Sequence, residues 1–170
     1  LQLYSANYQA DQKLELIHAL SFATKNMVVG QIYDTLSQLP EHLCPKTGVE
    51  EIHRKKTGSL IQCACVMGAI CGNATTEQQT AIKQFGDAIG LMFQIVDDLI
   101  DMQGTTEHIG KQTGKDASSG KITFPSTIGV EASIEAIESL QEQADEALRI
   151  LGDQGETLRT LNLWMAQRTR

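Results

Sequence analysis

Three aspartates stand close together in the middle of the chain, at Asp97, Asp98 and Asp101. In a helix, side chains three or four residues apart are neighbours, so these carboxylates converge on one face. Their mutual repulsion disfavours such a cluster, and so does a place near the helix C-terminus, where the macrodipole is negative. A bound cation would compensate for both effects, and hard oxygen ligands hold Mg²⁺, usually together with substrate phosphates. The pattern leaves two interpretations open, a solvated acidic face and a magnesium site.

The helical sector upstream of these aspartates carries four further unusual residues, Gly86, Asp87, Gly90 and Gln94. Each glycine costs a helix about 1 kcal/mol relative to alanine. A solvated face would more often include lysine or arginine and would avoid glycine. Glycine instead lets another group approach the backbone closely. This sector is therefore a candidate contact surface.

Lys56 is a second residue whose place is unusual. It falls between Ile52 and Leu60 in an apolar row, where a lysine is rarely buried. Its stem could extend along the protein and bring the ammonium group to water. Alternatively, the ammonium group could lie in a cavity and meet an anion. The residues alone leave both interpretations open.

Lysines also occur in a glycine-rich segment after the aspartates. Residues 104–120 hold four glycines with Lys111 and Lys115, and Lys121 follows directly. The segment has no apolar periodicity, so we expect a loop. Its spacing differs from that of a P-loop, which places four residues between its glycines where this chain has three. A loop of this length beside a carboxylate cluster is typical of a functional lid.

Helical periodicity predicts the elements that would position these residues. We expect helices over 10–38, from Thr47 onward, from Thr76 to the aspartates, over 122–130, and near 131–151 and 156–168. Thr47 with Glu50 has the spacing of a capping box at the start of the second helix. No strand-like alternation or repeat is present. The sequence therefore predicts one all-α unit over residues 1–170.

Three of these helices have apolar rows that predict the core. The first row contains Leu16, Leu20, Met27, Ile32 and Leu36. The second contains Val49, Ile52, Leu60, Ala64, Met67 and Cys71. The third contains Ile82, Phe85, Ile89, Met92, Val96 and Leu99. The third row has a regular 3-4-3-4-3 spacing, which is typical of a buried stripe.

Length, composition and charge exclude several other classes of protein. The 170 residues are 41% hydrophobic and 21% charged, as in a folded protein with its own core. The net charge is 14 − 21 = −7, which disfavours a nucleic-acid binder. The longest nearly apolar run, residues 60–70, is far shorter than the roughly 20 residues that span a bilayer. The four cysteines lack zinc-site spacing, so we interpret them as small buried side chains in a reducing cytoplasm.

Taken together, these segments resemble the trans-prenyl diphosphate synthases, most closely those of the farnesyl and geranylgeranyl type. Five stretches carry the resemblance in order: Gly30-Gln31 followed by Asp34, Lys56-Thr57-Gly58, the FQxxDDxxD pattern of residues 93–101, Ile109-Gly110-Lys111, and Gly120-Lys121 followed by Thr123-Phe124-Pro125. The order and spacing of five motifs are more specific than any one of them. The resemblance implies an isoprenoid-synthase-type helical bundle.

The resemblance also implies a reaction and a set of roles. The reaction would join an allylic diphosphate to isopentenyl diphosphate, with Mg²⁺ assisting ionisation, and would give a longer prenyl diphosphate. The implied metal ligands are Asp97, Asp98 and Asp101. The implied catalytic residues are Lys56, Thr57, Gln94 and Lys111. The implied substrate-binding residues are Lys56, Lys111, Lys121, Gln31 and Asp34. The resemblance further implies a homodimer whose interface includes residues 10–38.

One departure from the family pattern affects these expectations. The family has a first aspartate-rich motif on a partner helix, and no DDxxD precedes residue 97 here. The chain also begins with leucine. We therefore expect it to be the C-terminal portion of a synthase, without the N-terminal helices and inactive alone. Two alternatives remain, a catalytically incomplete regulatory subunit and a terpene-cyclase-type relative.

Overall fold

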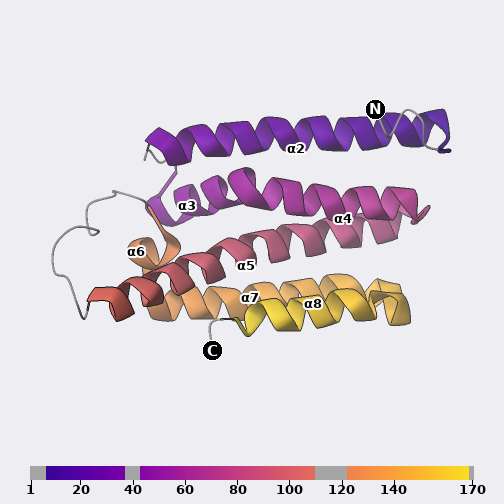
Figure 1. The fold of residues 1–170 in the computed structure, drawn as a ribbon. Coiled ribbons are helices and arrows are strands. Elements are labelled where there is room, and N and C mark those ends of the chain that lie inside the picture. The colour runs from indigo at the N-terminus through magenta and orange to yellow at the C-terminus, as the bar shows by residue number, and fades with distance from the viewer. Residues whose placement is uncertain (1–6, 37–42, 110–121, 169–170) are drawn as a thin grey trace.

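The computed structural model describes residues 7–36, 43–109 and 122–168. Every regular element in these residues is a helix, which confirms the all-α prediction (Figure 1). They are α2 (Ala10–Leu36), α3 (Pro45–His53), the π-helix η1 (Arg54–Gly58), α4 (Ser59–Cys71), α5 (Thr76–Ile109), α6 (Phe124–Ile128), α7 (Val130–Ala147), the 3₁₀ helix η2 (Leu148–Gly155) and α8 (Glu156–Ala166). Among the described residues, no helix combines the length and the apolar character that a bilayer crossing demands.

The helices lie side by side in layers, with α5 in the middle (Figure 1). Helix α2 packs on α4 and η1, and α4 packs on α5. The other side of α5 packs on α7, with α8 and η2 beside it. Helix α6 lies where α3, α5 and α7 meet. Helix α5 is therefore the element around which the others assemble.

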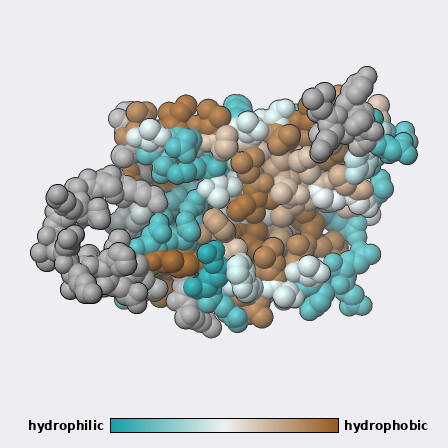
Figure 2. Space-filling view, in the orientation of Figure 1, coloured by the Kyte–Doolittle hydropathy of each residue, from teal (hydrophilic) through white to brown (hydrophobic). Residues whose placement is uncertain are grey.

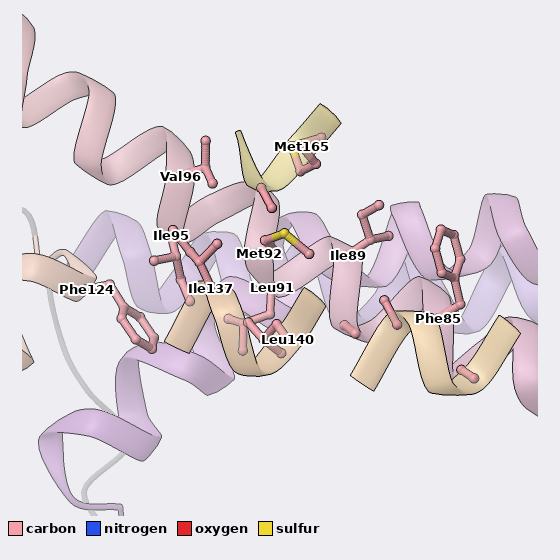
Figure 3. Close-up of a cluster of buried hydrophobic side chains, with 14 of the residues drawn as sticks. Phe85, Ile89, Leu91, Met92, Ile95, Val96, Phe124, Ile137, Leu140 and Met165 are labelled. Atoms are coloured by element: carbon pink, nitrogen blue, oxygen red, sulfur yellow. The ribbon is translucent and has the colours of Figure 1, made fainter. Parts of the chain in front are cut away.

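The core forms where the predicted stripe of α5 meets α7. All six residues of that stripe are buried, so this prediction is confirmed. Ile137 and Leu140 of α7, Phe124 of α6 and Met165 of α8 complete the same cluster (Figure 3). Burial of each large side chain stabilises the fold by roughly 1.5–3 kcal/mol relative to exposure.

Two predicted boundaries differ from the structure. Helix α3 begins at Pro45 with Cys44 as its N-cap, so the predicted capping box at Thr47 is wrong. Proline suits the first turn because its fixed φ is helical and its missing N–H has no partner there. The Thr47 hydroxyl donates to the Cys44 carbonyl at 3.1 Å. Helix α5 runs to Ile109, so the loop predicted over 104–120 is helical at its start, and its remainder lies outside the described residues.

The second apolar row, which begins with Val49 and Ile52, was predicted to be buried, and this prediction is wrong beyond Ile52. The π-helix gives the physical reason. Val49 and Ile52 are buried, but Leu60 is 38% exposed. A π-turn takes in more residues than an α-turn, so the face that follows it is rotated relative to a continuous α-helix. Cys63 and Ile70 are therefore the buried residues of α4.

Candidate functional site

The centre of the candidate site is η1, which lies between α2 and α5 and carries Lys56 and Thr57. Two glycines allow this close packing. A Cβ at Gly30 of α2 would lie 2.3 Å from the backbone nitrogen of Lys56, and a Cβ at Gly90 of α5 would lie 2.8 Å from the Cα of Gly58. The predicted contact surface of α5 is therefore approached by η1 at Gly90 and by α4 at Gly86, where a Cβ would lie 2.8 Å from the Cα of Gln62.

Every cation of η1 pairs with a carboxylate. Arg54 pairs with Asp87 of α5, Lys55 with Glu51 of α3 at 2.9 Å, and Lys56 with Asp34 of α2 at 2.7 Å. The Lys56 and Asp34 side chains are both half-buried, and an ammonium group has three donors. The pair therefore leaves Lys56 with donors that an anion could engage. The ammonium group of Lys56 is thus both partly exposed to solvent and paired with a carboxylate of α2.

Thr57 connects η1 to α5. Its hydroxyl donates to the side-chain oxygen Oε1 of Gln94 at 2.5 Å, and Gln94 is only 9% exposed. A hydroxyl that donates one hydrogen bond keeps its oxygen lone pairs for another partner. Thr57 and Gln94, which the resemblance implies as catalytic residues, are thus in contact.

The three aspartates of α5 lie in three different environments. Asp97 is half-buried, Asp101 is exposed, and Asp98 is only 2% exposed. The carboxylate oxygen Oδ2 of Asp98 lies 2.9 Å from Nε2 of His53. The same oxygen accepts the backbone N–H of Phe124 at 3.0 Å. The second aspartate therefore faces the core, whereas the first and third reach the surface.

His53 is a residue of this region that the motifs did not identify. The histidines have no ligand spacing in the sequence, so the motifs predict no role for any of them. His53 follows Val49 by four residues, which places it on the buried face of α3, and this was the available signal. Its partner lies 45 residues further along the chain, a separation that local periodicity does not address.

The carboxylates can be tested for Mg²⁺ on their donor chemistry. Within the residues that the structure describes, no three His, Cys, Asp or Glu side chains form a group that could hold a metal ion. Asp97 and Asp101 nevertheless lie one turn apart on α5 and offer hard oxygen donors at the surface. Mg²⁺ commonly takes one or two carboxylates and completes its shell with water and substrate phosphates. These two residues fit such a site.

Three further substrate-binding residues are predicted, and the structure describes only Gln31 among them. Gln31 is exposed, and its amide donates to the Thr35 hydroxyl at 2.9 Å along the same helix. Lys111 and Lys121 lie outside the described residues. Among the described residues, the candidates for this site are therefore Asp34, Lys56, Thr57, Gln94, Asp97 and Asp101.

The cysteines follow the predicted interpretation in part. All four are free thiols, and Cys63 is buried, but Cys44 is exposed. Burial raises the pKa of Cys63 and of Cys65, so these thiols stay protonated near neutral pH. A hydrogen bond with Thr47 lowers the pKa of Cys44.

An apolar cleft of about 620 Å³ lies elsewhere, where α4, α5 and α8 meet. Small side chains such as Ala64 and Gly68 of α4 line it, together with Ile82 of α5 and Leu158 of α8. None of the predicted site residues that the structure describes borders this cleft. It is separate from the carboxylate site.

Comparison with known proteins adds independent findings. A protein-family model described as "Polyprenyl synthetase" matches residues 1–159. The putative geranylgeranyl pyrophosphate synthase 8, chloroplastic, of Arabidopsis thaliana is 41% identical over 131 residues, which are 76% of this chain and 36% of that protein. The chain thus spans about a third of the length of that curated relative.

Two solved structures are similar in fold. The apo structure of a FPP/GFPP synthase from Zymomonas mobilis has a TM-score of 0.75 at 29% identity, covering 92% of this chain and 52% of that chain. The geranyltransferase from Helicobacter pylori complexed with magnesium and isoprenyl diphosphate has a TM-score of 0.70 at 29% identity. This match covers 98% of this chain and 55% of that chain. The described helices thus correspond to about half of each of these chains.

Proposed function

This chain belongs to the polyprenyl synthetase family, and on that premise we propose that its protein is a prenyltransferase. It joins an allylic diphosphate to isopentenyl diphosphate and releases a longer prenyl diphosphate. The observation that carries this proposal is the meeting of three separate motifs. Lys56 contacts Asp34, 22 residues away, and Thr57 contacts Gln94, 37 residues away. Residues that resemble synthase motifs therefore form one connected group.

The reaction begins with cleavage of the allylic carbon–oxygen bond. The diphosphate leaves with the bonding electrons, and an allylic cation remains. Lys56 lies at the junction of α2, η1 and α5, and its free donors would neutralise charge on the leaving diphosphate. Asp34 holds the ammonium group in place through the bond at 2.7 Å.

The allylic cation needs stabilisation without a nucleophile that would capture it. The Thr57 hydroxyl and the Gln94 amide are neutral dipoles, and their mutual hydrogen bond fixes the hydroxyl orientation. Thr57 would direct oxygen lone pairs at the cation while the double bond of isopentenyl diphosphate attacks it. Loss of a proton then gives the elongated product. Exclusion of water protects the cation from premature hydrolysis.

Asp97 and Asp101 would hold Mg²⁺ in the complete site. When bound, the ion would balance the charge of the diphosphate as it departs. The predicted third ligand, Asp98, is buried against His53 and Phe124. We also retain Lys111 and Lys121 as diphosphate-binding residues and Gln31 as a cavity residue, on the resemblance alone.

A second copy of this chain is the proposed partner of α2. Several large apolar side chains are exposed on this helix, and hydrophobic residues appear along the top of Figure 2, where α2 lies. Leu14 is 65% exposed and Phe22 is 56% exposed. Sedimentation of the complete gene product should give a dimer, and a monomer would contradict this part of the proposal. The four free thiols support the cytoplasm as its compartment.

The test is an assay of the complete gene product with Mg²⁺, an allylic diphosphate and radiolabelled isopentenyl diphosphate. The expected product is a longer prenyl diphosphate, and Asp97→Ala should reduce turnover by at least about 100-fold. Glu146→Ala, on the exposed face of α7, is the matched control and should leave turnover unchanged. Cyclic products from the allylic diphosphate alone would indicate a terpene cyclase. Activity that needs a second, different chain would indicate a regulatory subunit.

A further inference from the structure

The strongest feature that the proposed reaction does not use is the buried contact between His53 and Asp98. The His53 side chain is 4% exposed, and the Asp98 side chain has no exposed surface. Nε2 of His53 and the backbone nitrogen of Phe124 both lie within hydrogen-bond distance of Oδ2 of Asp98. The His53 ring also stacks on the Phe124 ring, with centroids 6.1 Å apart. One carboxylate thus joins α3, α5 and α6.

This anchor directly adjoins the candidate site. His53 is the last residue of α3, so η1 and its Lys56 follow at once. Asp98 is next to Asp97, one of the two residues that fit Mg²⁺. The anchor is itself enclosed in the protein, so it can hold these site residues without touching substrate. Residues that orient ligands in this way commonly affect metal affinity 10- to 100-fold when mutated.

We propose that His53 is a positioning residue: it holds the Asp98 carboxylate against the Phe124 amide, and Asp98 serves as this anchor while Asp97 and Asp101 bind the metal. The inference rests on the proposed prenyltransferase function. It gives two adjacent aspartates of one motif different tasks, one facing the core and one facing the site. It also assigns a role to a histidine that no motif contains.

The rival explanation is that His53 merely fills the core through its ring. His53→Phe separates the two, because phenylalanine keeps a ring to stack on Phe124 but lacks the N–H group. His53→Gln keeps a side-chain N–H group and is the conservative variant. Glu146→Gln is the control, since Glu146 pairs with Arg149 on the exposed surface of α7, away from the site and from α2.

The experiment uses the isotopically labelled complete gene product in the presence of inorganic diphosphate. Mn²⁺ is the probe, and paramagnetic broadening of the Asp97 and Asp101 amide signals reports its binding. Hydrogen exchange at the Phe124 amide reports the anchor independently of any metal. We expect His53→Phe to accelerate exchange at Phe124 and to raise the Mn²⁺ concentration for half-maximal broadening about 10- to 100-fold. We expect His53→Gln to restore part of both effects and Glu146→Gln to change neither.

Unchanged Mn²⁺ binding in a folded His53→Phe variant would overturn the inference and leave the prenyltransferase proposal intact. If His53→Phe does not fold, Asp98→Asn is the second variant, since it keeps an oxygen acceptor for Phe124 but removes the charge. Unchanged Mn²⁺ binding in that variant would also overturn the inference. Absence of broadening at Asp97 in the unsubstituted protein would refute the metal site itself, and therefore both proposals.

Discussion

Helices α2 and α5 are both long and both carry apolar residues at helical spacing, yet they differ in what surrounds them. Helix α5 lies between α4 on one side and α7 on the other, and its apolar stripe is buried. Helix α2 has 27 residues, of which only Leu16, Ala23 and Gly30 are buried. Its main contacts are with α3, η1 and α4. Apolar periodicity therefore identifies a helix, whereas its neighbours decide how much of it is buried.

The difference matters for the site because both helices hold η1. Gly30 of α2 and Gly90 of α5 touch its backbone from two directions. Gln94 and the carboxylates thus come from a helix that is packed on both sides, whereas Asp34 comes from a helix with an open outer face. We therefore expect changes in α5 to affect folding and changes in α2 to affect mainly the site and association.

The largest expected contrast compares one residue type on the two helices. Phe85→Ala on α5 should reduce the free energy of unfolding by about 3–5 kcal/mol, because Phe85 is completely buried. Phe22→Ala on α2 should change it by less than about 0.5 kcal/mol, because Phe22 is mostly exposed. Urea denaturation at concentrations where the chain is monomeric measures both. Equal losses would mean that α2 is covered within a single chain.

A smaller effect is expected where α2 touches η1. Gly30→Ala should cost about 1–3 kcal/mol of stability, since its methyl group would overlap the Lys56 backbone. It should also reduce turnover by moving Lys56. Gly68→Ala on α4 is the control, because nothing lies within 4 Å of its Cβ, and it should gain about 0.5–1 kcal/mol. Urea denaturation of the two variants in parallel checks this, and a neutral Gly30→Ala would contradict the close packing.

A weaker effect still is expected from the ion pair between α2 and η1. Asp34→Asn removes the charge that holds Lys56, but both side chains are half-buried, so stability should fall by no more than about 1 kcal/mol. Substrate affinity should fall more noticeably, because the ammonium group loses its fixed position. Steady-state kinetics of the complete gene product measures this as a raised KM. Glu146→Gln, from the exposed pair with Arg149, should change neither quantity.

The contrast also explains how much the sequence could predict. The stripe of α5 follows a regular period, so its burial could be predicted from spacing. The same periodicity predicted α2, α7 and α8 to within a few residues of the bounds that the structure describes. The exposed face of α2 could not, because its apolar row resembles that of a core helix and burial depends on which neighbours are present.

The site was predictable only where it depends on residue type. Lys56 and Gln94 were predicted because a lysine and a glycine-rich sector are unusual in apolar helices. Thr57 was predicted from the family resemblance alone, and the structure does bring it to Gln94. The π-helix was not predictable, since it arises where Gly30 and Gly90 pack on one segment. The bond between His53 and Asp98 spans 45 residues and depends on the tertiary fold.

The smallest expected effect concerns two thiols, one buried like the stripe of α5 and one exposed like the outer face of α2. Cys63 lies on the buried face of α4, and burial raises its pKa, whereas the hydrogen bond with Thr47 lowers the pKa of the exposed Cys44. Thiolates react with alkylating agents and thiols do not, so Cys44 should be modified first as the pH rises from about 7 toward the usual cysteine value of about 8.5. Mass spectrometry of peptides after timed alkylation gives the order. Thr47→Ala should slow the alkylation of Cys44 and leave the alkylation rate of Cys63 unchanged. Equal alkylation rates for the two cysteines would mean that α4 opens to solvent as readily as the outer surface. The packing of α4 between α2 and α5 argues against such opening.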